Sequence, residues 1–232
     1  HLQYTLKLIR DHGAKACVFD ASGTLFDVHS AAAKCRDDLG DKADQMSDMW
    51  RLKQLQYTWL RSLMGEYVPF WQVTADALDF ALAAVGIDNG SLRERLMNLY
   101  LELNCYDEVP GVLNVLKGGG LKTAILSNGS PEMLASAVAN SNIVEVLDAV
   151  ISVDDIKVFK VDPRVYQMAV DRFECAPGEI CFMSSNGWDA YAAAHFGFQV
   201  VWVNRFGQPV ERIPGQPKAE LDTLEGLPAL LG

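Results

Sequence analysis

The sequence lacks the marks of a membrane, secreted or nucleic-acid-binding protein. No apolar run reaches the roughly 18 residues that a membrane helix requires, and no basic segment followed by an apolar one suggests a secretory signal. Basic residues are also scarce, because 20 lysines and arginines stand against 30 aspartates and glutamates, for a net charge of −10. That sign opposes binding to nucleic acid or anionic lipid through charge alone. We therefore expect a soluble protein with no nucleic acid and no membrane as partner, in which any site for an anion is locally positive.

Paired cysteines are missing as well. The five cysteines form an odd number and contain no C-x-x-C pair. This pattern argues against a disulfide framework and against a structural zinc site. It predicts a protein of the reducing cytoplasm.

The apolar segments that are present predict an α/β fold. Short segments rich in β-branched and other apolar residues predict buried parallel strands at 16–20, 122–127, 149–152, 179–184 and 199–203. Helical patterns at 130–140, 162–173 and 188–197 separate the last four segments, as in a Rossmann-like doubly wound parallel sheet. The Pro- and Gly-richer run 207–217 predicts a surface loop before a short final helix.

Residues 28–108 carry a different pattern, which is helical throughout. Apolar periodicity runs through 48–64, 75–86 and 91–103. We therefore predict two domains: an α/β core domain of residues 1–27 and 109–232, and an all-helical cap domain of residues 28–108 inserted after strand one.

Polar side chains follow the predicted strands at the edge where open α/β sheets bind ligands. Taken singly, each has an ordinary structural explanation: Asp20 or Ser127 as a loop or helix cap, Lys160 as a surface charge, Asp189 as an acidic residue in the first turn of a helix. A core gains little from gathering such groups, and buried charges are costly unless they have a function. The combination therefore predicts an active site formed by Asp20, Ser127, Asn128, Lys160, Ser184, Asn186 and Asp189.

The order of these motifs resembles the haloacid dehalogenase (HAD) superfamily. D-x-x-G-T at 20–24, "LSNGS" at 126–130, Lys160 and "SSNGWD" at 184–189 match its four motifs along the whole core. Phosphatases of that superfamily carry acidic residues where this chain has Ser22 and Ser185. With those two carboxylates absent, a magnesium ion would be poorly bound, so we expect no metal and no other cofactor.

With these two serines the chain resembles the L-2-haloacid dehalogenase branch of the superfamily. The sequence motifs of that branch are similar to "GTLFDVHS" (23–30), "WRLKQLQYTWLRSLM" (50–64) and "LSNGSPEM" (126–133). The resemblance implies an (S)-2-haloacid dehalogenase, a hydrolase acting on carbon–halogen bonds. Its substrates would be short-chain L-2-haloacids, that is, small 2-haloalkanoic acids. Its products would be a halide ion and a D-2-hydroxy acid, formed through an aspartyl-ester intermediate with inversion at Cα. The resemblance also implies a homodimer that pairs through the cap.

Roles for the substrate-binding groups follow from this resemblance. Asp20 would be the nucleophile, kept ionised by Lys160, and Lys160 with Ser127 would hold the substrate carboxylate. Asn128 and Arg51 would receive the leaving halide. Arg51 shares a mainly apolar helix face with residues 55 and 59, where its ordinary explanation would be an ion pair one turn back or a side chain extended to solvent.

Roles for the supporting groups follow in the same way. Asp189, supported by Lys160 and Asn186, would orient or deprotonate the water that hydrolyses the ester. Thr24 and Ser184 would hold the carboxylates by hydrogen bonds.

The resemblance also assigns residues to the walls of the substrate pocket. Leu55, Phe70 and Trp188 would form the apolar wall around the substrate, and Tyr166 would orient neighbouring groups. Ser22 stands where most members of the branch have a tyrosine, so it removes part of the wall and changes the pocket.

Two other functions are compatible with the sequence. One is a magnesium-dependent phosphatase of the same superfamily acting on a small phosphorylated metabolite, which metal dependence would reveal. The other is a non-catalytic protein that binds a small acid, in which Asp20→Asn would behave as the wild type.

Overall fold

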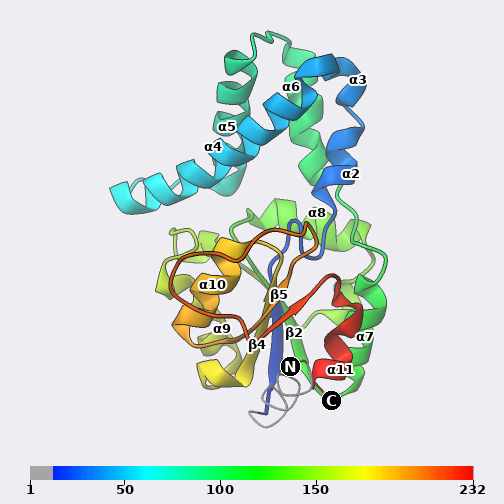
Figure 1. The fold of residues 1–232 in the computed structure, drawn as a ribbon, viewed down its shortest axis with the longest axis vertical. Helices are drawn as coiled ribbons and strands as arrows, with labels where there is room; N and C mark the ends of the chain where they lie inside the picture. The colour runs from blue at the N-terminus through cyan, green and yellow to red at the C-terminus, as the bar shows by residue number, and fades with distance from the viewer. Residues whose placement is uncertain (1–12, 232) are drawn as a thin grey trace.

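The fold centres on one parallel sheet (Figure 1), as seen in a computed structural model that describes residues 13–231. The part of the predicted core domain before residue 13 lies outside the described residues. The strands are β1 (Ala16–Phe19), β2 (Lys122–Ser127), β3 (Ala149–Ser152), β4 (Ile180–Ser184), β5 (Gln199–Val203) and β6 (Ala219–Leu221). Their order across the sheet is β3-β2-β1-β4-β5-β6, and every neighbouring pair is parallel.

The predicted fold class is confirmed, and five of the strands coincide with the predicted segments. β1, β4 and β5 are buried at every position, which explains why they are visible as continuous apolar runs. β6 was missed: the sequence indicated only a loop and a helix there. It has three partly exposed residues at the sheet edge and pairs with β5 alone, so it carries too little apolar pattern to be recognised.

The helices of the core cover both faces of the sheet. They are α7 (Val109–Gly118), α8 (Pro131–Asn140), α9 (Pro163–Phe173), α10 (Gly187–Phe196) and α11 (Leu227–Leu231). In Figure 1, α7 and α11 lie to one side of the strands, whereas α9 and α10 lie to the other. β2 and β3 lie on one side of β1 in the sheet, and β4 and β5 lie on the other, so the strand order reverses at β1. The carboxyl end of β1 is therefore the switch point at which such sheets bind ligands.

A group of helices follows β1 and stands beyond the carboxyl edge of the sheet (Figure 1). They are α2 (Val28–Ala33), α3 (Arg36–Leu39), α4 (Ala43–Met64), α5 (Phe70–Ala84) and α6 (Gly90–Asn98), followed by a 3-10 turn, η2 (Leu99–Leu101). The three predicted helices are present, with α4 and α5 each beginning five residues earlier than predicted. Gly65 ends α4 in the left-handed conformation, and the side chain of Asn89 caps the first turn of α6 by accepting from Leu92 N–H.

Two chain segments connect these helices to the sheet, and they are hydrogen-bonded to each other. The N–H of Asp27 donates to the carbonyl of Asn104 at 2.9 Å, and the N–H of Tyr106 donates to the carbonyl of Leu25 at 2.9 Å. Both connections therefore leave the core at one point, directly beside the loop that follows β1. Within residues 13–231, no helix is both long enough and apolar enough to cross a membrane.

Candidate active site

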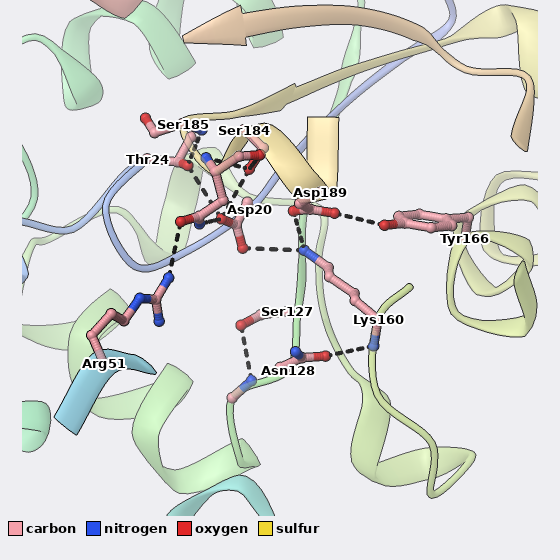
Figure 2. Close-up of polar contacts among 12 residues, drawn as sticks. Asp20, Thr24, Arg51, Ser127, Asn128, Lys160, Tyr166, Ser184, Ser185 and Asp189 are labelled. Atoms are coloured by element: carbon pink, nitrogen blue, oxygen red, sulfur yellow. Dashed lines mark hydrogen bonds and ion pairs between the residues drawn. The ribbon is translucent and has the colours of Figure 1, made fainter. Parts of the chain in front are cut away.

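Asp20 lies at the centre of the polar residues at the carboxyl edge of the sheet (Figure 2). Its Oδ2 atom accepts hydrogen bonds from Asn186 Nδ2 at 2.7 Å, Ser184 Oγ at 3.1 Å and Thr24 Oγ1 at 3.3 Å. Its Oδ1 atom accepts from Lys160 Nζ at 3.1 Å. Oδ2 is thus held by three donors, while Oδ1 keeps lone-pair capacity for another partner.

The loop after β1 is shaped to bring these donors to Asp20. Gly23 has a φ of +81°, a conformation that glycine adopts without strain, and it turns the chain so that Thr24 N–H bonds back to Ala21 O at 3.2 Å. Thr24 Oγ1 also accepts from the N–H of Ser185 at 2.8 Å. The threonine of the D-x-x-G-T motif therefore joins the end of β1 to the end of β4.

Lys160 lies between two carboxylates. Its ammonium is 3.1 Å from Asp20 Oδ1 and 2.7 Å from Asp189 Oδ2, and its side chain is only 1 % exposed. Burial by itself would lower the pKa of Lys160, but the two carboxylates outweigh burial and leave that pKa above its ordinary value. Lys160 therefore remains an ammonium.

One ammonium cannot neutralise two carboxylates fully. The pKa of the more deeply buried carboxyl, Asp189, is therefore raised. Asp189 is completely buried, and burial raises its pKa to about 6, even though Lys160 favours the ionised form. The Tyr166 hydroxyl donates to Asp189 Oδ1 at 2.8 Å and also favours ionisation. A carboxyl with this pKa can exchange a proton near neutral pH.

The side chain of Asn186 has a different partner from the expected one. We predicted that this side chain supports Asp189, but it has two other partners. Its Nδ2 donates to Asp20, and its Oδ1 accepts from Arg51 Nη2 at 2.9 Å. Asn186 begins α10, and what links it to Asp189 is the helical backbone bond from Asp189 N–H to its carbonyl, at 3.1 Å. The asparagine therefore joins the nucleophile candidate to Arg51 on α4.

Arg51 reaches the site from α4. Instead of pairing one turn back with Asp48, its guanidinium donates to Asn186 and, through Nη1, to Gln54 Oε1 at 2.9 Å. It also lines the central cavity together with Leu55, on the same helix face. The helical periodicity correctly predicted that these two side chains share a face, and the structure shows that this face is directed at Asp20.

A small cavity of about 40 Å³ lies between these groups. A cavity needs roughly 10–15 Å³ to hold one water molecule, so this one accommodates only a few water-sized groups. All six predicted substrate-binding residues line it: Ser22, Ser127, Asn128, Leu55, Phe70 and Trp188. Asn128 is fixed because its Oδ1 accepts from Lys160 N–H at 2.9 Å, which leaves its Nδ2 as the donor available to a ligand.

Four of the remaining predicted residues lie beneath the cavity surface and not on it. Thr24, Ser184, Tyr166 and Asp189 are buried and do not line the cavity. Ser127 lines the cavity, and its hydroxyl accepts from Gly129 N–H at 2.9 Å, which leaves the hydroxyl proton available to a ligand.

Several wall residues were not predicted. Tyr100 lies on η2, and Phe26 lies on the first connection to the cap. Met133, Leu134 and Ala137 come from α8. In the sequence they are apolar positions of ordinary helices or loops, with no signal that separates a cavity wall from a core.

Ser185 occupies the position at which related phosphatases carry an acid. Its N–H bonds to Thr24, and its carbonyl accepts from Trp202 Nε1 at 3.2 Å. Its buried hydroxyl has no hydrogen-bond partner in the part of the chain that the structure describes. Nowhere in residues 13–231 do three His, Cys, Asp or Glu side chains gather in a way that could hold a metal ion.

Comparison with known proteins agrees with this geometry. A profile of the haloacid dehalogenase-like hydrolases matches residues 14–197. The chain is 49% identical over 218 residues to (S)-2-haloacid dehalogenase 1 of Pseudomonas sp. (strain CBS-3), covering 94% of this chain and 96% of that protein.

Two solved structures are similar over almost the whole chain. One is a dehalogenase with an intermediate complex, at 45% identity and a TM-score of 0.92, covering 94% of this chain and 97% of that one. The other is L-2-haloacid dehalogenase from Xanthobacter autotrophicus with chloropropionic acid covalently bound, at 36% identity and a TM-score of 0.87, covering 94% and 98%.

Proposed function

This chain belongs to the haloacid dehalogenase-like hydrolase family, and from that premise we propose that it hydrolyses short-chain L-2-haloacids to D-2-hydroxy acids. It is a hydrolase acting on carbon–halogen bonds. The observation that carries the proposal is the arrangement of Asp20, held by four donors, beneath the Arg51 guanidinium of the cap. The overall reaction consumes one water and releases halide and a proton.

The first step is displacement of the halide by Asp20. Oδ1 attacks Cα of the substrate from the side opposite the halogen, so a C–O bond forms as the C–X bond breaks and the configuration at Cα inverts. The Lys160 ammonium pairs with Asp20 Oδ1 at 3.1 Å. Ser127 and the backbone N–H groups after Asp20 bind the substrate carboxylate, which holds Cα in line with Oδ1.

The leaving halide carries a full negative charge and needs donors directed at it. Arg51 and the Nδ2 group of Asn128, which both line the cavity, supply them. Leu55, Phe70 and Trp188 exclude water from this step. A dry cavity strengthens the attraction between guanidinium and halide.

The second step is hydrolysis of the aspartyl ester. Asp189 accepts a proton from the attacking water, and the pKa of about 6 leaves it mostly ionised at neutral pH. The water attacks the carbonyl carbon of the Asp20 ester, beside the Lys160 ammonium that lies between the two carboxyl groups. Hydrolysis releases the hydroxy acid and restores the Asp20 carboxylate.

We propose that residues 28–108 form a cap domain that opens to admit the substrate, while residues 1–27 and 109–232 form the core domain. The cavity is too small to exchange ligands freely. The hydrogen bonds that would break on opening include Arg51 Nη2 to Asn186 Oδ1 at 2.9 Å, Tyr67 OH to Asp154 Oδ1 at 2.7 Å, Phe159 N–H to Ser62 Oγ at 3.1 Å, and Trp71 N–H to the Ser130 hydroxyl.

A homodimer that forms through α4 is also proposed. Leu60, Leu63 and Met64 are exposed in succession at the end of this helix, at 50%, 86% and 70%. Burying them against a second copy removes an apolar patch from water. Sedimentation that detects only a species near 25.5 kDa at micromolar concentration would contradict the dimer.

The cell compartment is proposed to be the cytoplasm. All five cysteines are free thiols, and three of them, Cys17, Cys35 and Cys181, are buried in the core. Fully reduced cysteines are typical of a reducing compartment.

The function is tested by measuring halide release from the L and D forms of 2-chloropropionate, with EDTA present. We expect release from the L form only, loss of release in Asp20→Asn, and normal release in Asp171→Asn, which changes an exposed aspartate on α9. Release that persists in Asp20→Asn, or that requires added Mg²⁺, would contradict the proposal.

A further inference from the structure

Helix α4 contains a buried amide, Gln54, that contacts two residues lining the cavity, Arg51 and Tyr100. Gln54 on α4 has no exposed surface. Its Nε2 atom donates to Thr74 Oγ1 at 3.0 Å and to Tyr100 OH at 3.3 Å, and its Oε1 atom accepts from Arg51 Nη1 at 2.9 Å. A buried amide in an apolar helix pair is costly unless it is hydrogen-bonded, so these contacts explain how it is tolerated there.

The orientation of this amide is fixed from the side away from Arg51. Thr74 has one hydroxyl proton, and it donates that proton to the carbonyl of Phe70 at 2.7 Å. Towards Gln54, the Thr74 oxygen can therefore only accept. The NH₂ end of Gln54 must face Thr74, and its carbonyl end must face Arg51. The reversed amide would place an NH₂ group against the guanidinium, where both are donors.

The chemical nature of the acceptor matters as much as its position. A carboxylate at residue 54 would neutralise Arg51 and weaken its attraction for an anion, whereas an amide oxygen holds the guanidinium without cancelling its charge. The other guanidinium contact, Nη2 to Asn186 Oδ1, is also to a neutral amide. Among the described residues, both partners that hold Arg51 over the cavity are therefore neutral acceptors.

We propose that Gln54, oriented by Thr74, is a positioning residue that directs a fully charged Arg51 at the departing halide. This inference rests on the proposed role of Arg51 in the displacement step. A chain of hydrogen bonds in the cap then orients the guanidinium of Arg51. It runs from the Phe70 carbonyl through Thr74 and Gln54 to Arg51.

The inference is tested with Thr74→Val, which keeps the shape of the side chain but removes the acceptor, and with Thr74→Ser as the matched variant that keeps the hydroxyl. In single turnovers of L-2-chloropropionate, chloride release reports ester formation and hydroxy-acid release reports ester hydrolysis. We expect Thr74→Val to slow ester formation about tenfold, the effect of a misplaced charged donor, and to leave ester hydrolysis unchanged. Thr74→Ser should match the wild type.

Two further variants keep the test decisive if Thr74→Val folds poorly. Gln54→Met removes the amide and retains the volume, and it should slow ester formation in the same way. Gln54→Glu should slow it more strongly, because its carboxylate neutralises Arg51. Equal slowing of both half-reactions, no slowing in either Thr74→Val or Gln54→Met, or failure of Thr74→Ser to restore the rate would overturn the inference and indicate a structural role only.

A readout independent of turnover separates this inference from the proposed function. Rotation of the Arg51 guanidinium about its Cζ–Nε bond can be followed by NMR with ¹⁵N-labelled arginine, using Arg51→Lys to assign the signal. We expect slow rotation in the wild type and Thr74→Ser, and faster rotation in Thr74→Val. Equal rotation in all three overturns the positioning role, whereas absence of halide release by the wild type contradicts the proposed function.

Discussion

The ammonium of Lys160 lies 2.7 Å from Oδ2 of Asp189, although the exposure of the two side chains is only 1% and 0%. The same ammonium lies 3.1 Å from Asp20. Three charges are therefore buried together with a net charge of −1, so the pair of carboxylates competes for one cation. Burial is the largest cause that raises the pKa of Asp189 to about 6, and the neighbouring charge of Asp20 adds to it, while Lys160 acts in the opposite direction.

We predict an acidic limb in the pH profile of turnover, with a midpoint of about 6. Below this pH Asp189 is protonated and cannot accept the proton of the attacking water, so the rate falls as pH falls. Single-turnover measurements from pH 4.5 to 8 check this expectation, and the limb should appear in ester hydrolysis. A rate of ester hydrolysis that is flat down to pH 4.5 would contradict the role of Asp189.

Tyr166→Phe should move this limb to higher pH. The Tyr166 hydroxyl donates to Asp189 and lowers its pKa by stabilising the ionised form, so removing it raises that pKa. The variant is compared with the wild type over the same pH range. Tyr191→Phe on α10 serves as the control, because the Tyr191 ring packs on Trp202 and the hydroxyl that donates to Asp189 is that of Tyr166, so this variant should leave the limb unchanged.

Lys160→Met should abolish activity and destabilise the fold by about 3–5 kcal/mol at pH 7, because it leaves two buried carboxylates without a counter-charge. Urea unfolding measures the loss. The loss should shrink as pH falls, since burial raises the pKa of Asp189, and the unpaired Asp189 carboxyl regains stability when it is protonated.

A matched control for that substitution is Lys15→Met, at an exposed lysine that pairs with Glu179 on the surface. Its unfolding curve should coincide with that of the wild type. A Lys160→Met curve that also coincides, or a destabilisation that grows at low pH, would show that the three charges are not coupled as described.

Most of the core, and the polar residues that gather at the carboxyl edge of the sheet, could be predicted because each has a local signal. Asp20 and Ser127 end continuous apolar strands, and parallel strands bring their carboxyl ends to one edge whatever the details of packing. Arg51 could be assigned to the site only through the family resemblance, because an arginine on a mainly apolar helix face has an ordinary structural explanation. Gln54 could not be predicted, because a glutamine on a helix is ordinary and only the packing of α4 against α5 shows that it is buried. The partner of Asn186 depends on side-chain geometry that no spacing encodes.

The connection between cap and core contains one further buried ion pair, which the sequence did not indicate. Arg205, just after β5, lies 2.5 Å from Glu108 Oε1 and stacks 3.8 Å above the ring of Tyr106, on the second connection to the cap. The same guanidinium donates through Nε and Nη2 to the carbonyl of Thr24, at 3.2 and 2.9 Å. One side chain therefore fixes the nucleophile loop against that connection.

Arg205→Lys should lower the rate of ester formation about tenfold while leaving the overall fold intact, because lysine keeps the charge but cannot reproduce the planar, forked contacts of arginine. Arg205→Ala should instead destabilise the protein by about 3 kcal/mol, since it leaves the Glu108 carboxylate buried and unpaired. Urea unfolding of Arg205→Ala, Glu108→Ala and the double variant separates the two effects. If the pair is coupled, the double variant loses less stability than the sum of the single ones, whereas simple additivity would mean that Arg205 acts on the loop without Glu108.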